Sequence, residues 1–331
     1  MDRKVKCLVA AVLLITAVFA AVGCGGGDAV EQEELKKVTV MLDWVPNTNH
    51  TGLYVAQEMG YFEEHGLEVE IIQPSQTATA QMVAAGQVPF GVSYQEEVTM
   101  ARATDVPIVS IAAVIQHNTS GFASLKEDAI TSPMDFENKR YGGWGSPVEE
   151  ATIKSLMEKH NADFDSVEFV NVGAADWFSI IGKEVDFTWI YYGWTGIEAE
   201  LRGVDINYIE LIKEDPALDF YTPVIITNES LLSEDPELVK SFIAAVTQGY
   251  EYAIDNPDES AEILLSAVPE LDPELVKASQ QYLSKKYQDD APRWGEQKHE
   301  IWENYAQWLA DRDLIEKMIE VENVFTNDFL P

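Results

Sequence analysis

The chain has 331 residues, and its 57 aspartates and glutamates outnumber 22 lysines and arginines, which gives a formal net charge of −35 at pH 7. A surface this acidic repels nucleic acid and anionic lipid headgroups, so neither is expected as a binding partner. The chain is also too long for one ordinary hydrophobic core, which favours two lobes.

The N-terminal segment has the pattern of a secretory signal peptide. Three basic residues open it: Arg3, Lys4 and Lys6. An apolar run, 8–22, follows, and small residues lead up to Cys24. The alternative is an uncleaved membrane helix, but the run is short for a span of about 20 residues, and three glycines follow Cys24 at once. We therefore expect export, with residues 1–23 as the signal peptide.

The four residues Ala21-Val22-Gly23-Cys24 resemble a bacterial lipobox. The resemblance implies that Cys24 takes a diacylglycerol and becomes the mature N-terminus, and two or more acyl chains on one residue anchor a protein stably. The expected location is the extracytoplasmic face of the cell membrane, contacted through the lipid anchor only, with 24–37 as a lipidated linker. Because Cys7 leaves with the signal, a disulfide, a thiol nucleophile and a cysteine metal site are excluded.

Beyond the linker, short β-rich apolar runs alternate with segments of helical periodicity. The expected strands are 38–42, 68–72, 90–93, 108–115, 141–143, 167–172, 186–191 and 223–227. The expected helices between them are 52–59, 77–85, 94–104, 148–160, 175–183 and 195–201. This alternation is the βαβ rhythm of a doubly wound α/β fold. The helix at 148–160 has a good start, since Ser146 can cap it and Pro147 takes its first position.

From Glu229 onward only helices are expected, broken by four prolines at 236, 257, 273 and 292. The last helix, 295–319, carries a series of large apolar residues: Trp302, Tyr305, Trp308, Leu309 and Ile315. Such a series is more typical of a helix face packed on a lobe than of a binding strip. We therefore expect it to lie in the core.

Four motifs carry a family resemblance. They are 41–56 (MLDWVPNTNHTGLYVA) with 60–62 and 66–67, then 93–96 (SYQE), 141–147 (YGGWGSP) with Glu149, and 189–194 (WIYYGW). Together they resemble the thiamine-precursor branch of the nitrate/sulfonate/taurine-type periplasmic binding proteins, whose members bind formylaminopyrimidine. The four motifs lie between residues 41 and 194.

This resemblance implies an α/β, type 2 periplasmic-binding-protein fold: two α/β lobes joined by a two-strand hinge, with a helical C-terminal segment. Residues 38–121 and 222–331 would form lobe one, and 122–221 lobe two. It also implies the solute-binding component of an ABC importer, a monomer without cofactor that closes on its ligand and delivers it to a permease and its ATPase. Each motif follows an expected strand, which agrees with the general rule that open α/β sheets bind ligands at the carboxyl ends of their strands.

Aromatic residues are concentrated at these strand ends. Flat aromatic side chains favour a planar ring, and a stacked pair contributes about 0.5–1.5 kcal/mol beyond area burial. Core packing is the alternative and must hold for some of them, because successive strand residues face opposite sides. If Tyr191 faces the ligand, Tyr192 turns away unless the strand has already ended. The candidates for ligand contact are Trp44, Tyr94, Trp144, Tyr191, Tyr192 and Trp194.

The same motifs contain acids and amides but no Arg or Lys, the usual partners of sulfonate and phosphate. A carboxylate beside an aromatic wall suits an aminopyrimidine, because it accepts from the exocyclic amine and, if the ring is protonated, from a ring nitrogen. Glu96 or Asp43 is the candidate for that role, and a solvated acid at a helix start is the alternative for Glu96. Asn49 and Gln95 are further candidates for ligand contact, and the helix start at Ser146 is expected to receive a carbonyl or carboxylate of the ligand.

His50 lies within the first motif, where it either contacts the ligand or fixes its loop by a hydrogen bond. The other four histidines lie in unrelated settings. The sequence contains no HExxH, phosphate loop or nucleophile elbow, and no metal site is expected.

The nearest enzyme alternative is the yeast-type pyrimidine synthase, which resembles this fold but consumes its own lysine-bound cofactor and an active-site histidine. In that family a lysine follows the third strand, the histidine lies a few residues later, and a cysteine-rich iron site follows. Here residues 91–97 read GVSYQEE, and no cysteine follows Cys24. We therefore expect a binding protein and not an enzyme.

Riboflavin importers are also similar to this branch, and a riboflavin-binding component remains the alternative. Both ligands are planar heteroaromatics, so an aromatic site does not separate them. An adhesin or structural lipoprotein would fit the anchor but not the motifs.

Overall fold

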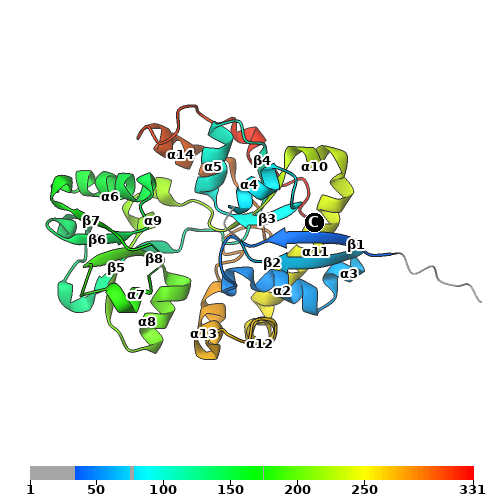
Figure 1. Cartoon of the computed structure of the whole chain (residues 1–331), viewed down its shortest axis with the longest axis horizontal. Helices are drawn as coiled ribbons and strands as arrows, with labels where there is room; N and C mark the ends of the chain where they lie inside the picture. The colour runs from blue at the N-terminus through cyan, green and yellow to red at the C-terminus, as the bar shows by residue number, and fades with distance from the viewer. Residues whose placement is uncertain (1–33, 75–77, 174) are drawn as a thin grey trace, which may run out of the picture. The chain divides into compact units, whose positions relative to one another are not determined.

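The computed structural model describes residues 34–74, 78–173 and 175–331, and the expected signal peptide and Cys24 lie outside this part. Within it, ten strands form two five-stranded sheets, here called sheet A and sheet B (Figure 1). Sheet A has the order β2 (Leu67–Ile72), β1 (Lys36–Met41), β3 (Phe90–Ser93), β10 (Val224–Asn228) and β4 (Ile108–Ala113). Sheet B has the order β7 (Glu168–Asn171), β6 (Arg140–Gly143), β8 (Phe187–Tyr191), β5 (Ser120–Leu125) and β9 (Ile206–Glu210).

The two sheets share one pairing pattern. In sheet A, β1 pairs in parallel with β2 and β3, and β10 pairs antiparallel with β3 and β4. In sheet B, β6 pairs in parallel with β7 and β8, and β5 pairs antiparallel with β8 and β9. The antiparallel strand of each sheet is the first one after the chain arrives from the other sheet. The chain therefore passes between the sheets twice, through residues 114–119 (the first crossing) and 219–223 (the second crossing).

Helices cover both faces of each sheet. Those of the sheet A half are α2 (Thr51–Glu58), α3 (Tyr61–Glu64), α4 (Thr79–Ala84), α5 (Gln95–Ala103), α10 (Glu229–Glu234), α11 (Pro236–Asp255), α12 (Pro257–Ala267), α13 (Pro273–Leu283) and α14 (His299–Ala310). Those of the sheet B half are α6 (Pro147–Lys159), α7 (Trp177–Ile180), α8 (Ile197–Leu201) and α9 (Leu211–Glu214). Short turns of helix complete the chain: η1 (Thr48–His50), η2 (Lys126–Asp128), η3 (Pro133–Phe136), η4 (Phe164–Ser166), the π-helix η5 (Tyr192–Gly196), η6 (Pro216–Leu218) and η7 (Val321–Asn323).

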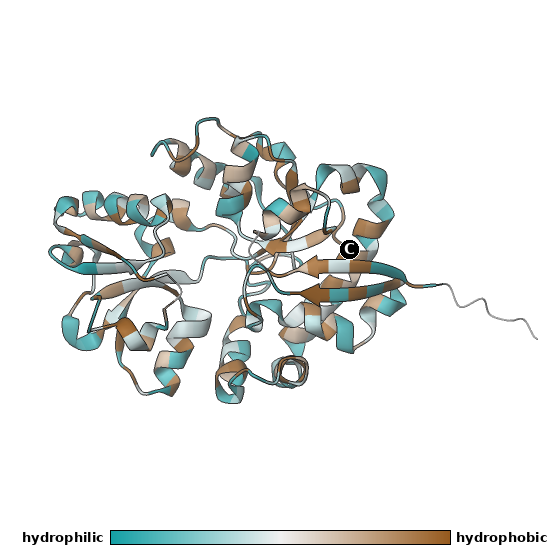
Figure 2. Cartoon of the chain, in the orientation of Figure 1, coloured by the Kyte–Doolittle hydropathy of each residue, from teal (hydrophilic) through white to brown (hydrophobic). Residues whose placement is uncertain are grey.

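Sheet A is built from largely hydrophobic strands (Figure 2). On one of its faces α2, α3 and α11 form a core in which Phe90 stacks on Phe242 with ring centroids 3.8 Å apart. Helices α2 and α11 touch through backbone, because a Cβ on Gly249 would lie 2.0 Å from the Gly52 carbonyl oxygen. A second core covers the other face, where α4, α5 and α14 pack.

Sheet B separates its two faces by alternation along β5. Phe122 packs toward α6 with Tyr141 and Phe187, whereas Ala123 packs toward α7 with Trp177 and its neighbours. Figure 1 shows α6 along one side of this sheet and α7 and α8 along the other. Successive residues of β5 therefore contribute to opposite faces of the sheet, as the two-residue period of a strand requires.

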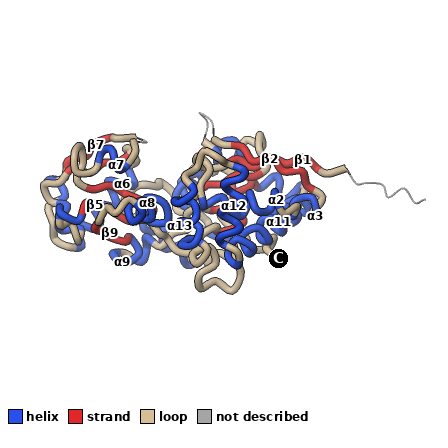
Figure 3. Tube along the Cα trace, turned by 90° about the horizontal axis from the view of Figure 1, so that it is seen from below, coloured by secondary structure: helices blue, strands red, loops and turns tan. Residues whose placement is uncertain are grey.

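After β10 the described residues form helices and no further named strand, as the sequence predicted for this part. Three of the four prolines that were expected to break helices begin them, since Pro236, Pro257 and Pro273 are the first residues of α11, α12 and α13. The side chains of Asp235 and Asp272 cap α11 and α13. Helix α12 lies beside α13 and α2 (Figure 3). The apolar series expected at 295–319 is buried, which confirms its core role: Trp302, Tyr305, Trp308 and Leu309 on α14, and Ile315 after it.

Four expectations about elements are corrected. Strands β5 and β9 were not expected. The helix expected at 175–183 is shorter, since only α7 forms there, and the helix expected at 295–319 is also shorter, since only α14 forms there. β5 reads SGFASL, which lacks the β-branched residues typical of strands. It forms because it is central and buried, and at Gly121 a Cβ would lie 2.3 Å from the Ile209 carbonyl oxygen.

Across residues 34–74, 78–173 and 175–331, no helix combines the length and the apolar character needed to cross a membrane. This finding covers only that part of the chain.

Candidate ligand-binding site

A buried histidine fixes the loop that follows β1. The Nδ1 atom of His50 accepts a hydrogen bond from the Asn47 backbone N–H at 3.2 Å, and its Nε2 atom lies 2.8 Å from Asp43 Oδ1. Because Nδ1 is an acceptor, the ring proton is on Nε2, which donates to Asp43. His50 is fully buried and thus makes the loop-fixing hydrogen bonds that were the alternative to ligand contact.

This loop carries three candidate residues. The Trp44 side chain is 57% exposed. The carboxylate of the preceding residue, Asp43, is fixed by its hydrogen bond with His50. The Asn49 backbone is fixed at both ends, since its N–H donates to Asn47 Oδ1 at 2.9 Å and its carbonyl accepts from the Tyr250 hydroxyl at 2.7 Å. The loop therefore presents an accessible indole next to a carboxylate of defined position.

Gln95, at the start of α5, is a structural residue in this arrangement. It is fully buried, its Oε1 accepts from the Tyr221 N–H at 2.8 Å, and its Nε2 donates to the Ile301 carbonyl at 3.1 Å. Its own backbone N–H donates to the Tyr221 carbonyl at 2.9 Å. Gln95 thus joins α5 to the second crossing and to α14. Both polar atoms of its side-chain amide make hydrogen bonds to other parts of the protein.

The neighbouring acids are held at the same helix start. Burial raises the pKa of Glu96 to about 7, although a hydrogen bond from the Tyr305 hydroxyl, at 3.4 Å, lowers it. Burial also raises the pKa of Glu97, which accepts a hydrogen bond from the Ser93 hydroxyl at 2.6 Å. Glu96 is half-buried and shielded, which favours it over the solvated alternative. Glu97 was not among the expected site residues, although the sequence places it beside Glu96 in the first turn of the helix.

In the sheet B half, Glu149 organises the loop between β6 and α6. Its buried carboxylate accepts from the Tyr141 hydroxyl at 2.6 Å, and from the backbone N–H groups of residues 144, 145 and 146 at 3.2, 2.8 and 2.8 Å. Gly143 is required here because a Cβ would lie 2.3 Å from Glu149 Oε1. The loop leaves Trp144 50% exposed. The spacing Ser146-x-x-Glu149 is a capping box, a signal that could have identified Glu149.

One expectation about this loop is wrong. The start of α6 was expected to receive a carbonyl or carboxylate of the ligand, but its N–H groups are already occupied. Residues 144–146 donate to Glu149, and the Val148 N–H donates to the Ser146 hydroxyl at 3.2 Å. The protein's own carboxylate therefore fills the position that a helix N-terminus offers to an anion.

Replacing Ser146 by alanine removes this cap. We expect the Ser146→Ala variant to lose about 1 kcal/mol of unfolding free energy, the usual effect of removing an N-cap hydroxyl. Chemical denaturation at pH 7 measures this loss. An unchanged midpoint would show that the hydroxyl does not stabilise α6.

Tyr191 ends β8 and is 42% exposed, while Ile190 before it is buried. Trp189, on the same side of the strand, packs edge to face on Trp144 with centroids 5.9 Å apart and on Phe122 at 5.5 Å. The exposed Trp144 ring is thus backed by Trp189. Alternation along the strand accounts for which of these residues are accessible.

Tyr192 and Trp194 lie elsewhere. The strand ends at Tyr191 and η5 begins, so Tyr192 turns toward α13, where its ring lies 5.6 Å from that of Tyr282 and its hydroxyl donates to Glu200. Trp194 packs on the apolar cluster around Leu264 of α12. These two aromatic residues attach η5 to the helices of the sheet A half and do not join the group around Tyr191.

Electrostatic influence connects four of the candidates: Asp43, Tyr94, Glu96 and Tyr191. Burial raises the pKa of Tyr94, and Glu97, Glu96, Tyr191 and Asp43 raise it further. Glu149 also acts on Glu96. Residues of the two sheets, Tyr94, Glu96 and Asp43 from one and Tyr191 and Glu149 from the other, therefore lie within one electrostatic neighbourhood. Trp44 follows Asp43 in its loop, and the Trp144 N–H donates to Glu149. We call Asp43, Trp44, Tyr94, Glu96, Trp144 and Tyr191 the aromatic–acid site.

The aromatic–acid site combines accessible rings with carboxylates. Its motifs contain no Arg or Lys, so a sulfonate or phosphate would meet negative charge without a counter-charge from them. A neutral or cationic flat ring with N–H donors fits these groups. None of the six residues of the site lines the pocket of about 250 Å³ in the sheet B half, whose lining residues are Tyr141, Gly143, Gly145, Ser146, Pro147, Glu149, Glu150, Phe169, Val170 and Asn171. Among the described side chains, no group of three or more His, Cys, Asp and Glu is placed to hold a metal ion.

Sequence comparison gives relatives for nearly the whole chain. Residues 47–260 match the family described as NMT1/THI5 like. The formylaminopyrimidine-binding protein of Halalkalibacterium halodurans is 34% identical, over 95% of this chain and 97% of that protein. The 4-amino-5-hydroxymethyl-2-methylpyrimidine phosphate synthase of Legionella pneumophila is 26% identical over 89% of this chain and 92% of its own. The riboflavin-binding protein RibY of Chloroflexus aurantiacus is 23% identical over 91% of this chain and 88% of its own.

Among solved structures, the periplasmic aliphatic sulphonate binding protein SsuA of Escherichia coli superposes with a TM-score of 0.67. The match covers 87% of this chain and 91% of SsuA, at 10% sequence identity. At that identity the likeness concerns the fold, and it confirms the periplasmic-binding-protein fold that the four motifs implied. The chain belongs to the NMT1/THI5-like family.

Proposed function

We propose that this protein is the extracytoplasmic solute-binding component of an ABC importer for a planar heteroaromatic thiamine precursor, formylaminopyrimidine or hydroxymethylpyrimidine. The observation that carries the proposal is the aromatic–acid site, in which exposed rings from both halves accompany carboxylates, and in which Tyr94 and Tyr191 lie within the electrostatic reach of Glu96. The formylaminopyrimidine-binding relative, 34% identical over 95% of the chain, supports this ligand class.

The site chemistry suits such a ring. Trp44, Tyr94, Trp144 and Tyr191 are 57%, 36%, 50% and 42% exposed, so their faces are available for stacking. An exocyclic amine donates to a carboxylate, and Glu96, with its pKa raised to about 7, can also share a proton with a ring nitrogen. Asp43, held by His50, is the second acceptor.

Binding is proposed to occur by lobe closure. The proposed lobes are residues 38–121 with 222–331 and residues 122–221; the first boundary falls within the opening residues of β5 and the second within the second crossing, and the two crossings act as the hinge. Closure around a ligand is a common use of two domains joined in this way. The closed monomer then engages the permease and its ATPase.

The role is binding and not catalysis. The stretch 91–97, GVSYQEE, has neither the lysine nor the histidine implied for the related synthase, and the chain has no cysteine beyond Cys24. The binding-protein relative is also more similar to this chain than the Legionella synthase is.

Anchoring is proposed at Cys24, on the cell membrane's outer side. Mass spectrometry of the protein purified from membranes tests it. A mature N-terminus at Cys24 carrying diacylglycerol is expected, and an unmodified or uncleaved chain would contradict the anchor.

A thermal-shift series tests the ligand class. Formylaminopyrimidine or hydroxymethylpyrimidine is expected to raise the Tm, since a ligand bound only to the folded state stabilises it. Riboflavin is the second candidate because of the RibY relative. A shift with riboflavin and none with the pyrimidines would replace the proposal with that alternative, and thiamine serves as a larger pyrimidine control.

Trp44 provides a test that leaves the fold intact. Its side chain is mostly exposed, so Trp44→Ala is expected to change stability by less than about 0.5 kcal/mol. Loss of a stacked face should weaken pyrimidine binding by roughly three- to tenfold. Fluorescence or calorimetric titration measures the affinity, and Val45→Ala, equally exposed and adjacent, is the control.

A further inference from the structure

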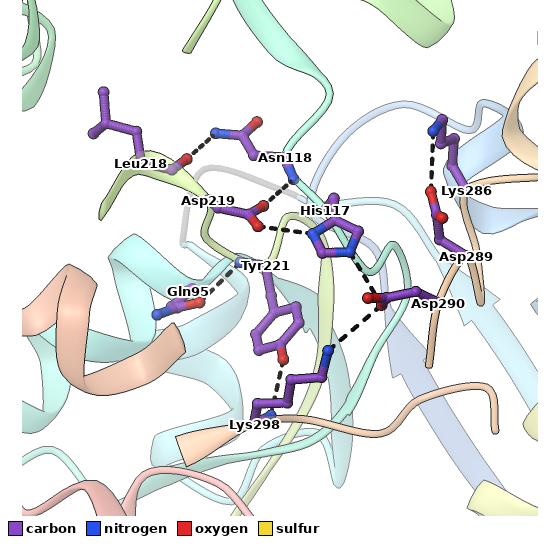
Figure 4. A network of polar contacts seen from close by, with 10 residues as sticks. All are labelled: Gln95, His117, Asn118, Leu218, Asp219, Tyr221, Lys286, Asp289, Asp290 and Lys298. Atoms are coloured by element: carbon purple, nitrogen blue, oxygen red, sulfur yellow. Dashed lines mark hydrogen bonds and ion pairs between the residues drawn. The ribbon is translucent and has the colours of Figure 1, made fainter. Parts of the chain in front are cut away.

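The two crossings are fastened to each other by one histidine (Figure 4). In the first crossing, His117 Nδ1 lies 2.7 Å from Oδ2 of Asp219, which begins the second crossing. Its Nε2 lies 3.2 Å from Oδ1 of Asp290, in the segment between α13 and α14. The imidazole therefore joins three segments that are distant in the sequence.

The same contact is reinforced by backbone. The other Asp219 oxygen accepts from the Asn118 N–H at 3.0 Å, and the Asn118 side chain donates to the Leu218 carbonyl at 2.8 Å. Asn118 Oδ1 in turn accepts from the Ser120 N–H at 2.8 Å, at the first residue of β5. The first crossing is thus held to the second along its final residues.

Both ring nitrogens face carboxylate oxygens, which only accept hydrogen bonds. A neutral imidazole has one N–H, so it can satisfy one of the two acids, whereas the imidazolium satisfies both. Hydrogen bonding to Asp219 is the largest cause that raises the pKa of His117 to about 9, opposed by partial burial. The hydrogen bond from His117 likewise lowers the pKa of Asp290.

The other charged groups near the imidazole belong to the sheet A half. Lys298 Nζ lies 3.5 Å from Asp290 Oδ1, and its backbone N–H donates to the Tyr221 hydroxyl at 2.8 Å. The remaining charges form pairs of their own: Lys286 with Asp289, and Arg293 with Glu296. One lysine therefore partly balances the two acids, and the imidazolium supplies the second positive charge.

We propose that charged His117 is a positioning residue for ligand binding, which holds the two crossings to each other as a pin, so that the hinge is already ordered when the two halves close on the ligand. The inference rests on the proposed function, because the crossings act as the hinge of a binding protein. Without the pin, ordering the crossings is a cost that ligand binding must meet. The pin loosens when the imidazole loses its proton.

The test is a pH series on the full chain and its His117→Gln variant. A histidine with a raised pKa in the folded state adds stability that is complete below its unfolded pKa, near 6.5, and is lost as the pH rises through about 9. We expect His117→Gln to lower the Tm by roughly 3–6 °C at pH 6.5 and to leave it unchanged at pH 10. His299→Gln is the matched control, since that imidazole also lies between two acids, at 3.7 and 3.5 Å, but joins no crossing.

Affinity separates positioning from simple stabilisation. The ratio of formylaminopyrimidine affinities, parent over variant, is expected to be about three to ten at pH 7 and about one at pH 10, and titration of the ligand and of Glu96 cancels in the ratio. A Tm difference independent of pH, or an affinity ratio of one at pH 7, would overturn the inference. Failure of the parent to bind any pyrimidine would instead overturn the proposed function, and the Tm series would still decide on the pin.

Discussion

The Glu96→Gln variant is expected to be more stable than the parent above pH 7 and to bind the pyrimidine less tightly. Burial raises the Glu96 pKa from 4.5 to about 7, so the folded protein holds that proton more firmly than the unfolded chain does. The free energy of unfolding therefore falls as the pH rises from about 4.5 to about 7, and glutamine avoids this loss. The expected gain at pH 8 is roughly 2–3 kcal/mol, with no gain near pH 4.

The affinity should change in the opposite direction. Removing a charged acceptor of the ligand's N–H groups costs about 1.5–3 kcal/mol, which is roughly a 10- to 100-fold weaker Kd. A residue that lowers stability and raises affinity is typical of a functional site. Differential scanning calorimetry and ligand titration at pH 4 and pH 8 measure both effects.

Glu251 offers a matched control for this variant. Burial raises its pKa too, but it lies on α11, where Asp255 is the acid that acts on it. Glu251→Gln should leave the affinity unchanged. If Glu96→Gln bound the pyrimidine as tightly as the parent, the carboxylate would not be the acceptor, and Asp43 would be the remaining candidate.

The second large effect is expected at Glu149. Glu149→Ala leaves the Tyr141 hydroxyl and the backbone N–H groups of residues 144–146 without their acceptor. Each buried donor left unsatisfied costs about 1–3 kcal/mol, and partial hydration limits the sum to about 3–5 kcal/mol. Because the loop carries Trp144, we also expect at least a tenfold loss of pyrimidine affinity.

The control for the Glu149→Ala variant is a substitution of the next residue, Glu150. Glu150 is exposed in the same first turn of α6, so Glu150→Gln should change stability by less than about 0.5 kcal/mol. Acetate is expected to stabilise Glu149→Ala more than Glu150→Gln at equal ionic strength, since an anion can enter the vacated N–H groups. Equal stability of both variants would show that Glu149 does not organise the loop.

The sequence predicted the fold where local patterns are strong. The parallel strands of both sheets have apolar runs, and Ser146-Pro147 has local helix-start chemistry, so these elements were expected close to their true bounds. β5 was missed because its strand state depends on long-range pairing with β8 and β9, and not on its residues. Tertiary pairing overrides weak β-propensity in such a strand.

The site was predictable in composition but not in geometry. The motifs at the strand ends carry Trp44, Tyr94 and Trp144, and all three side chains are exposed. The inward role of Gln95 could not be read from the chain, because its partner Tyr221 becomes a neighbour only through folding. The loop-fixing hydrogen bond of His50 was one of the two roles that the sequence left open, and its partner Asp43 lies in the same motif.

Tyr192 and Trp194 illustrate the same limit. Their direction depends on the residue at which β8 gives way to η5, and a shift of one residue reverses the side that a strand residue faces. Ligand contact by the remaining candidates stays a prediction.

The central claim is that the aromatic–acid site binds a flat, nitrogen-rich ring and not an anion. Calorimetric titration of the chain with formylaminopyrimidine and with taurine tests it most directly. The proposed function predicts saturable binding of about one formylaminopyrimidine per chain, weakened in Glu96→Gln, and no heat from taurine. Tight binding of taurine with no response to the pyrimidine would contradict it.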